Sequence, residues 1–302
     1  MPARLDWSRD GGDWPNRSAS RFVRAGGLTW HVQTAGDGDD VLLLHGTGAS
    51  THSWRGLFVA LSRDHRVIAP DLPGHAFTDP LPYGRTTLPG MAEAVGALLK
   101  KLGARPRIIV GHSAGAAIAI RMALDGHAAP DAIVSLNGAL FPISNSFARP
   151  FFVGAAKLLA LNPLTPWLFA LRARDPVAVR RLLDGTGSEI DPLDEEIYGR
   201  LATTTSHVSG ALGMMAGWDL HALEDDLSKL ETPLLLVVGE ADAMVPPGRA
   251  AGVARLAKNA RVVCLQGLGH LAHEEAPGKI HALIGEFAPK TAAPEQKAAA
   301  HG

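Results

Sequence analysis

Short apolar runs recur along the chain and alternate with segments whose apolar residues have helical spacing. The first two runs, Arg21–Arg24 and Leu28–Thr34, flank Ala25-Gly26-Gly27 and predict a β-hairpin. The later runs are apolar almost throughout, which is typical of parallel strands that are buried on both faces. We expect six such strands, at Val41–Leu44, Arg66–Ala69, Arg107–Val110, Ala132–Leu136, Leu234–Val238 and Val262–Leu265, with helices at Trp54–Arg63, Leu88–Leu102 and Ala114–Leu124. This alternation predicts an α/β fold built on a mostly parallel sheet.

The alternation stops in the middle of the chain. Between residues 141 and 230 helical patterns occur without a convincing strand, over a stretch far longer than an ordinary connection. We therefore predict a core domain made of residues 1–140 and 231–288, interrupted by a helical cap, or lid, over residues 141–230. The final segment, residues 289–302, is rich in Ala, Pro and Lys, and we expect it to be disordered.

Composition excludes several classes of protein. The chain has 302 residues, of which 46% are hydrophobic and 20% charged, as in ordinary globular proteins. Its net charge is −1 and its basic residues are scattered, so no concentrated basic face is available for nucleic acid. The single cysteine, Cys264, cannot form an internal disulfide, and its strand-like surroundings predict a buried thiol.

The sequence favours a cytoplasmic location. Its first residues lack the apolar segment of a secretory signal. The apolar stretch 151–171 is interrupted by polar residues and two prolines, so it predicts two short helices rather than a membrane span. The same stretch could touch a membrane surface as part of the lid.

Ser113 carries the clearest chemical signal. It stands in a Gly-x-Ser-x-Gly sequence, directly after a predicted strand and before a predicted helix. A strand that turns sharply into a helix exposes one side chain at the turn, and Gly111 and Gly115 remove the Cβ atoms that would clash there. Such a turn places the hydroxyl of a nucleophilic serine beside a helix N-terminus, which favours negative charge. The five-residue motif is weak evidence without catalytic partners.

The partners follow two later strands. Asp242 comes after Leu234–Val238, and His270 comes after Val262–Leu265. Because the carboxyl ends of parallel strands meet at one edge of the sheet, the three side chains are expected to form a catalytic triad in the order Ser113, Asp242, His270. Histidine would be the general base and then acid, and aspartate would orient it. Glu240 and His273 are the alternatives at the second and third positions.

An oxyanion hole needs two backbone N–H donors. We expect one from Ala114, directly after the nucleophile, and the other from Thr47 in the sequence His45-Gly46-Thr47-Gly48, although a plain glycine turn remains the alternative there. His45 and His112 flank the site and are assigned no chemistry. No histidine pair with an added carboxylate has convincing metal-ligand spacing, so we expect no metal and no cofactor.

These motifs together resemble the α/β-hydrolase superfamily over residues 21–288. Longer strings point to one family within this superfamily. The chain resembles the BchO family in HGTGASTHSW (45–54), GHSAGAA (111–117), LNGAL (136–140), MMAGWDL (214–220) and GLGHLAHEE (267–275). The resemblance implies an α/β-hydrolase fold of eight strands with its cap after the sixth. It also implies an association with magnesium chelatase in bacteriochlorophyll biosynthesis. The chain departs from the wider superfamily at Ala76, where Gly is common.

Two functions are therefore predicted. The first is a serine hydrolase for an ester or thioester of an apolar substrate, with Phe151, Phe152 and Trp167 of the lid binding it; these aromatics could equally pack the lid onto the core. The second is a non-catalytic porphyrin-binding or accessory protein for magnesium insertion into protoporphyrin IX. The expected partners are a small apolar molecule, such as a tetrapyrrole or its ester, magnesium chelatase subunits, and the surface of the photosynthetic membrane.

Overall fold

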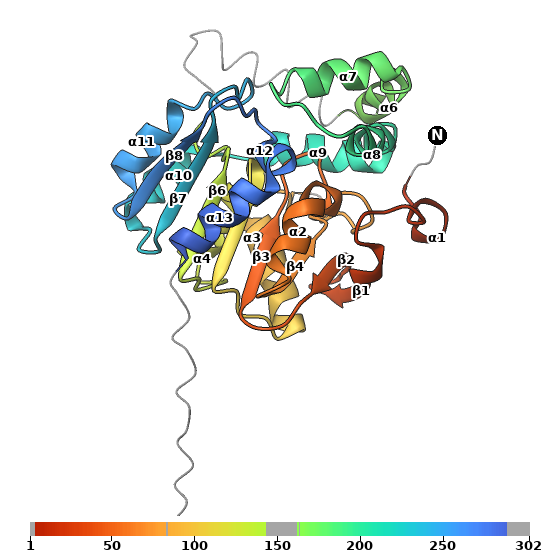
Figure 1. Ribbon diagram of the computed structural model, residues 1–302. Helices are drawn as coiled ribbons and strands as arrows, with labels where there is room; N and C mark the ends of the chain where they lie inside the picture. Colours follow the sequence, from red (N-terminus) through yellow and green to blue (C-terminus); the bar gives the residue numbers. More distant parts are fainter. Residues whose placement is uncertain (1–3, 83, 143–161, 163, 289–302) are drawn as a thin grey trace, which may run out of the picture.

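A single sheet of eight strands lies at the centre of the protein (Figure 1). The computed structural model describes residues 4–82, 84–142, 162 and 164–288. The strands follow the order β1-β2-β4-β3-β5-β6-β7-β8 across the sheet. Their bounds are β1 Ser20–Ala25, β2 Leu28–Ala35, β3 Asp40–Leu44, β4 Arg66–Pro70, β5 Ile108–His112, β6 Ala132–Leu136, β7 Leu234–Gly239 and β8 Ala260–Leu265.

The sheet is parallel from β4 to β8. β1 and β2 form the predicted antiparallel hairpin, and β2 pairs antiparallel with β4. All other neighbours are parallel. Every residue of β3, β5, β6 and β7 is buried, because helices cover both faces of the central strands. The predicted α/β-hydrolase sheet of eight mostly parallel strands is confirmed.

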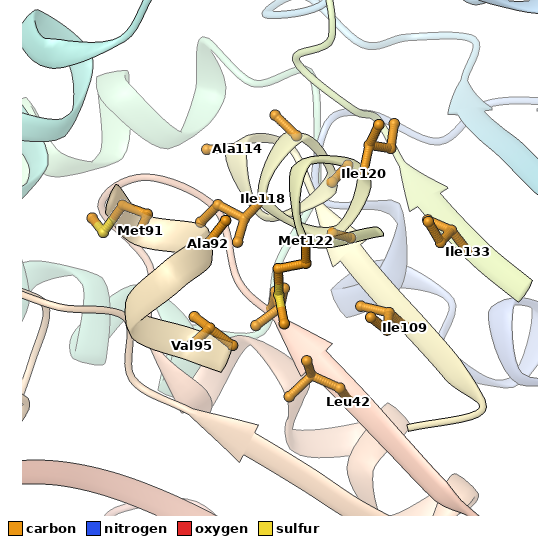
Figure 2. Packing of buried hydrophobic residues seen from close by; sticks show 14 of the residues in the cluster. Leu42, Met91, Ala92, Val95, Ile109, Ala114, Ile118, Ile120, Met122 and Ile133 are labelled. Carbon is orange, nitrogen blue, oxygen red and sulfur yellow. The ribbon is translucent and has the colours of Figure 1, made fainter. Parts of the chain in front are cut away.

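Two layers of helices enclose the sheet. The layer on one face consists of α3 (Leu88–Leu102), α4 (Ala114–Leu124), α10 (His221–Asp226) and α11 (Arg249–Leu256). The other face is covered by α2 (Arg55–Leu61) and α13 (Pro277–Phe287). Figure 2 shows the first layer at close range, where Ile118 and Met122 of α4 pack among Met91 and Val95 of α3 and side chains of the sheet. The small residues of α4 allow this close approach, which fixes the helix that begins beside Ser113.

Helices fill the described part of the segment between β6 and β7. They are α6 (Leu164–Arg172), α7 (Pro176–Asp184), α8 (Pro192–Ala202) and α9 (Thr205–Gly217), followed by α10 and the 3₁₀ turn η3 (Leu227–Lys229). We call α6 to α9 the cap helices; they gather beyond one edge of the sheet (Figure 1). α10 and η3 instead place Leu223 and Leu227 in the main core. The boundaries at 141 and 230 stay a prediction, and the tail predicted over 289–302 lies outside the described residues.

Short helices complete the chain. α1 (Trp7–Asp10) and η1 (Arg17–Ala19) precede the first strand, η2 (Thr51–Trp54) leads into α2, and α12 (Ala272–Glu275) leads into α13. The N-terminal segment is anchored to the core, since Trp14 is buried and its indole N–H donates to Thr51 Oγ1 at 3.0 Å.

The prediction of a buried Cys264 is wrong. The thiol is exposed because β8 is the edge strand of the sheet and its helices cover it only in part. Val263 and Leu265 pack partly against the core, whereas Cys264 alternates to the other face of the strand. An apolar run marks this strand correctly, but it does not reveal that the strand lies at an edge.

Candidate active site

Ser113 occupies a strained turn between β5 and α4. Its backbone has φ 49° and ψ −113°, a conformation that non-glycine residues rarely adopt. Glycines on both sides permit it, since a Cβ on Gly111 would lie 2.5 Å from Ala116 N and one on Gly115 would lie 2.0 Å from Leu44 O. The predicted turn of the Gly-x-Ser-x-Gly sequence is therefore present, and Ser113 itself is half-buried.

Asp242 and His270 form a hydrogen-bonded pair at the carboxyl ends of β7 and β8. His270 Nδ1 lies 2.8 Å from Asp242 Oδ2. The backbone N–H groups of Met244 and Val245 both donate to Asp242 Oδ1 at 2.8 Å, so each oxygen of the carboxylate is held. The hydrogen bond between His270 and Asp242 assigns a proton to Nδ1 of the imidazole and leaves Nε2 available as the basic atom.

Asn137 completes the surroundings of the carboxylate, and the sequence alone gave it no role. Its Nδ2 donates to Asp242 Oδ2 at 2.7 Å and to the backbone oxygen of Gly269 at 3.4 Å. The residue follows β6 directly and has a positive φ of 49°. A polar residue at the end of a strand between those that carry Ser113 and Asp242 is the signal that could have identified it.

The environment keeps Asp242 ionised. Burial raises the pKa of the carboxyl group, but the hydrogen bond and charge of His270, with the donors from Val245 and Asn137, lower that pKa below its ordinary value. Glu240, the alternative acid, is exposed and accepts a hydrogen bond from Gly267 N instead. His273, the alternative base, bonds Ser53 Oγ through Nε2 at 2.8 Å. The geometry thus pairs Asp242 with His270 and not with His273.

Ser113 lies beside this pair without bonding to it. The preceding residue, His112, donates from Nε2 to the backbone oxygen of His270 at 3.0 Å, and the two rings lie 4.8 Å apart. Within the described part of the chain, Ser113 Oγ makes no hydrogen bond with His270 or with any other residue. The three predicted residues therefore lie together at the carboxyl ends of the strands, and the serine hydroxyl makes no hydrogen bond to the other two.

The loop after β3 runs directly over Ser113. A Cβ on Gly46 would lie 2.7 Å from His112 Nδ1 and 3.1 Å from Ser113 Cβ, so a side chain at this position would push against the turn that carries the serine. The backbone N–H groups of Thr47 and Ala114 donate to no acceptor among the described residues. Two free donors on either side of the serine are what an oxyanion hole requires.

Buried His45 fixes the direction of the Thr47 N–H. Its Nδ1 donates to the Gly46 backbone oxygen at 2.8 Å, and its Nε2 accepts from Leu72 N at 2.8 Å. Ala49 N also donates to that oxygen, at 3.2 Å. Because the C=O and N–H of a trans peptide point in opposite directions, holding the Gly46 carbonyl aims the Thr47 N–H away from it. Burial lowers the pKa of His45, which keeps the ring neutral for this role.

Comparison with known proteins identifies the family. Residues 40–277 match the family described as alpha/beta hydrolase fold. The chain is 39% identical to the magnesium-chelatase 30 kDa subunit of Rhodobacter capsulatus over 282 aligned residues. The alignment covers 90% of this chain and 95% of that protein. The chain is an α/β hydrolase of the BchO family. The resemblance seen in the sequence is confirmed.

More distant relatives of this α/β hydrolase include enzymes. It is 28% identical to the pimeloyl-[acyl-carrier protein] methyl ester esterase of Aeromonas hydrophila, over 85% of this chain and 98% of that protein. Among solved structures, the epoxide hydrolase CorEH superimposes with a TM-score of 0.75 at 24% identity, covering 89% of this chain and 97% of that one. That last likeness shows the fold alone.

The lid residues of this α/β hydrolase are only partly described by the structure. Phe151 and Phe152, predicted to bind substrate, lie outside the described residues. Trp167 lies on α6 with 47% of its surface exposed, beside the exposed side chains of Leu164 and Leu168. Across the described ranges, Trp167 makes no aromatic contact or hydrogen bond with the Ser113 site. Its role in binding stays a prediction.

The described residues contain neither a membrane-spanning helix nor a metal-binding cluster. None of their helices combines the length and hydrophobicity needed to cross a bilayer. Over the same ranges, His, Cys, Asp and Glu side chains form no group of three or more that could hold a metal ion.

A buried polar network of this α/β hydrolase lies behind the site. The ring of His112 lies 4.4 Å from that of His273, whose Nε2 contacts Ser53 Oγ. Ser53 Oγ also bonds Glu274 Oε1, which accepts from the Tyr198 hydroxyl at 2.6 Å. Burial raises the pKa of Glu274 to about 8, so the carboxyl group is largely protonated at neutral pH. This network joins η2, α8 and α12 by hydrogen bonds rather than by charge.

Proposed function

We propose that this protein is a serine hydrolase that cleaves an ester or thioester bond of an apolar substrate. The observation that carries the proposal is the Asp242–His270 hydrogen bond of 2.8 Å at the sheet edge where Ser113 occupies its strained turn. Strain of this kind persists only where the surrounding structure enforces it, and it is concentrated at functional sites.

The reaction follows from the roles of these groups. Ser113 Oγ attacks the carbonyl carbon while His270 Nε2 takes the hydroxyl proton, and the Asp242 carboxylate stabilises the resulting imidazolium. The N–H groups of Thr47 and Ala114 bind the oxyanion of the tetrahedral intermediate. His270 returns the proton to the leaving alcohol or thiol, and the acyl group stays on Ser113. Water then attacks the acyl-enzyme by the same route, which releases the acid and restores the serine.

The relatives support both the class of reaction and the biosynthetic pathway that we propose for the protein. One relative is a methyl ester esterase, which supports ester cleavage. The magnesium-chelatase 30 kDa subunit supports a role in bacteriochlorophyll biosynthesis, with a tetrapyrrole or its ester as substrate and magnesium chelatase subunits as partners. The apolar exposed face of α6, with Leu164 and Trp167, supports a contact with an apolar substrate or with the surface of the photosynthetic membrane.

One observation favours a second function. Because Ser113 Oγ makes no hydrogen bond to His270 in the described structure, the same fold could bind a porphyrin as an accessory protein without turning it over. The relative named for magnesium chelatase is compatible with either function.

Hydrolysis of p-nitrophenyl esters separates the two functions. The wild-type protein should release p-nitrophenol from acetyl to octanoyl esters, and Ser113→Ala should lose this activity while keeping its fold by circular dichroism. Protoporphyrin IX is titrated in parallel and followed by its Soret absorbance. Porphyrin binding that is equal in both proteins, without turnover that depends on Ser113, would refute the hydrolase and support the accessory protein.

A further inference from the structure

His207 connects the cap to the loop that carries the Thr47 N–H. It lies on α9, is buried, and uses both ring nitrogens. Its Nδ1 accepts from Ala76 N at 3.0 Å, and its Nε2 donates to the backbone oxygen of Gly48 at 3.0 Å. Burial lowers the pKa of His207 to about 4, so the ring is neutral and each nitrogen keeps one role. The two contacts join one cap helix to two loops of the core.

The contact with Gly48 holds the turn that presents the Thr47 N–H. In that turn Ala49 N donates to Gly46 O at 3.2 Å, and the peptide between residues 48 and 49 supplies both this N–H and the carbonyl bound by His207. Gly48 has a φ of 78°, and because glycine lacks a Cβ its backbone can also adopt other conformations when no hydrogen bond holds it. With both ends of the peptide held, the turn over Ser113 has a single orientation.

The contact with Ala76 holds a second unusual backbone conformation. Ala76 has a φ of 40°, a backbone conformation that residues with a Cβ rarely adopt. The residue is buried, and its N–H donates to His207. The loop after β4 thus depends on the cap in the same way as the loop after β3.

Helix α9 is seated firmly enough to position both loops. One turn after His207, a Cβ on Gly210 would lie 2.1 Å from Gly74 O, so the two backbones are in direct contact. Further along, Thr86 Oγ1 bonds the Gly213 oxygen at 3.4 Å. A Cβ on Gly217 would lie 3.0 Å from Thr86 O. Small residues therefore let one face of α9 rest on the core over its whole length.

We infer that His207 is a positioning residue of the oxyanion hole, supplied by the cap through its bond to the Gly48 carbonyl. This inference rests on the proposed function, because it assigns the Thr47 N–H to the oxyanion. Its consequence is that catalysis depends on a seated α9, even though His207 does not contact the reacting atoms.

A pair of isosteric variants tests the inference. The amide oxygen of His207→Asn replaces Nδ1, which keeps the bond to Ala76 and loses the bond to Gly48. The amide nitrogen of His207→Gln replaces Nε2 and keeps the bond to Gly48. With p-nitrophenyl butyrate, His207→Asn should lower kcat about 10-fold with KM unchanged, less than the roughly 10²–10³ that follows loss of an oxyanion donor. His207→Gln should stay within about 3-fold of the wild type, and exposed His221→Asn is the control.

Hydrogen exchange of residues 45–50 provides a readout that needs no turnover. It should accelerate in His207→Asn and stay near the wild-type rate in His207→Gln. Equal kcat and equal exchange in the two variants would overturn the inference while leaving the hydrolase intact. Faster exchange in His207→Asn alone, in a protein that shows no Ser113-dependent turnover, would support the cap contact and refute the hydrolase.

Discussion

Replacing Ser113 with glycine should stabilise the protein while abolishing its activity. The backbone of Ser113 has φ 49° and ψ −113°, a conformation in which a Cβ atom clashes with the neighbouring backbone. Glycine adopts this conformation without that conflict. Ser113→Ala is the matched control, since it keeps the Cβ and removes only a hydroxyl that makes no hydrogen bond in the described structure.

The size of the effect follows from two opposing terms. A non-glycine residue in such a region costs roughly 1–3 kcal/mol of folding free energy. Glycine adds disorder to the unfolded chain, which costs about 0.5–1 kcal/mol. The net expectation for Ser113→Gly is a gain of about 1 kcal/mol in the free energy of unfolding, or roughly 2 °C in Tm for a chain of this length. Ser113→Ala should differ from the wild type by less than about 0.5 kcal/mol.

Equilibrium unfolding in urea, followed by tryptophan fluorescence, measures these differences. Gly115→Ala serves as a control of opposite sign, since its Cβ would lie 2.0 Å from Leu44 O and should destabilise the protein by about 2 kcal/mol or more. If Ser113→Gly were no more stable than Ser113→Ala, the turn would not store strain and the reasoning would be wrong.

Three further variants probe the surroundings of the site. Asp242→Asn should lower kcat about 10⁴-fold, because the amide no longer stabilises an imidazolium or fixes its tautomer; steady-state kinetics with a p-nitrophenyl ester measure it. Asn137→Ala should lower kcat about 10- to 100-fold in the same assay, because Asp242 loses a donor at 2.7 Å. Glu274→Gln should change how stability depends on pH. The pKa of Glu274 is about 8 in the folded protein against an ordinary value of 4.5, so its stabilising contribution is complete below pH 4.5 and is lost as the pH rises to 8. Urea unfolding at pH 5 and pH 8 should therefore show the wild type losing on the order of 2–4 kcal/mol relative to Glu274→Gln; no relative change would contradict a protonated Glu274.

The sheet was predictable because its signal is local. Fully buried strands such as β3 and β5 read as short apolar runs, and the chain order of Ser113, Asp242 and His270 follows from where those runs end. The exposure of Cys264 was not predictable in this way, since an edge strand and a central strand can have the same apolar sequence.

The supporting residues of the site depend on contacts between distant segments. Asn137 reaches Asp242 across 105 residues of sequence, and His207 reaches Gly48 across 159. The position of Asn137 directly after β6 is a weak signal of its role, whereas nothing near His207 in the sequence marks its partner. His207 in particular looks like an ordinary polar residue of a helix until the cap is folded onto the core. The chemistry is therefore visible in the sequence, whereas its positioning is not.

The rate at which a fluorophosphonate modifies Ser113, followed by intact-mass spectrometry and peptide mapping, tests the central claim most directly. We expect a single adduct on Ser113 in the wild-type protein. We also expect a rate at least about 10³-fold lower in His270→Ala, because the hydroxyl loses its base. An adduct on another residue, or one on Ser113 that forms equally fast without His270, would contradict the proposed triad.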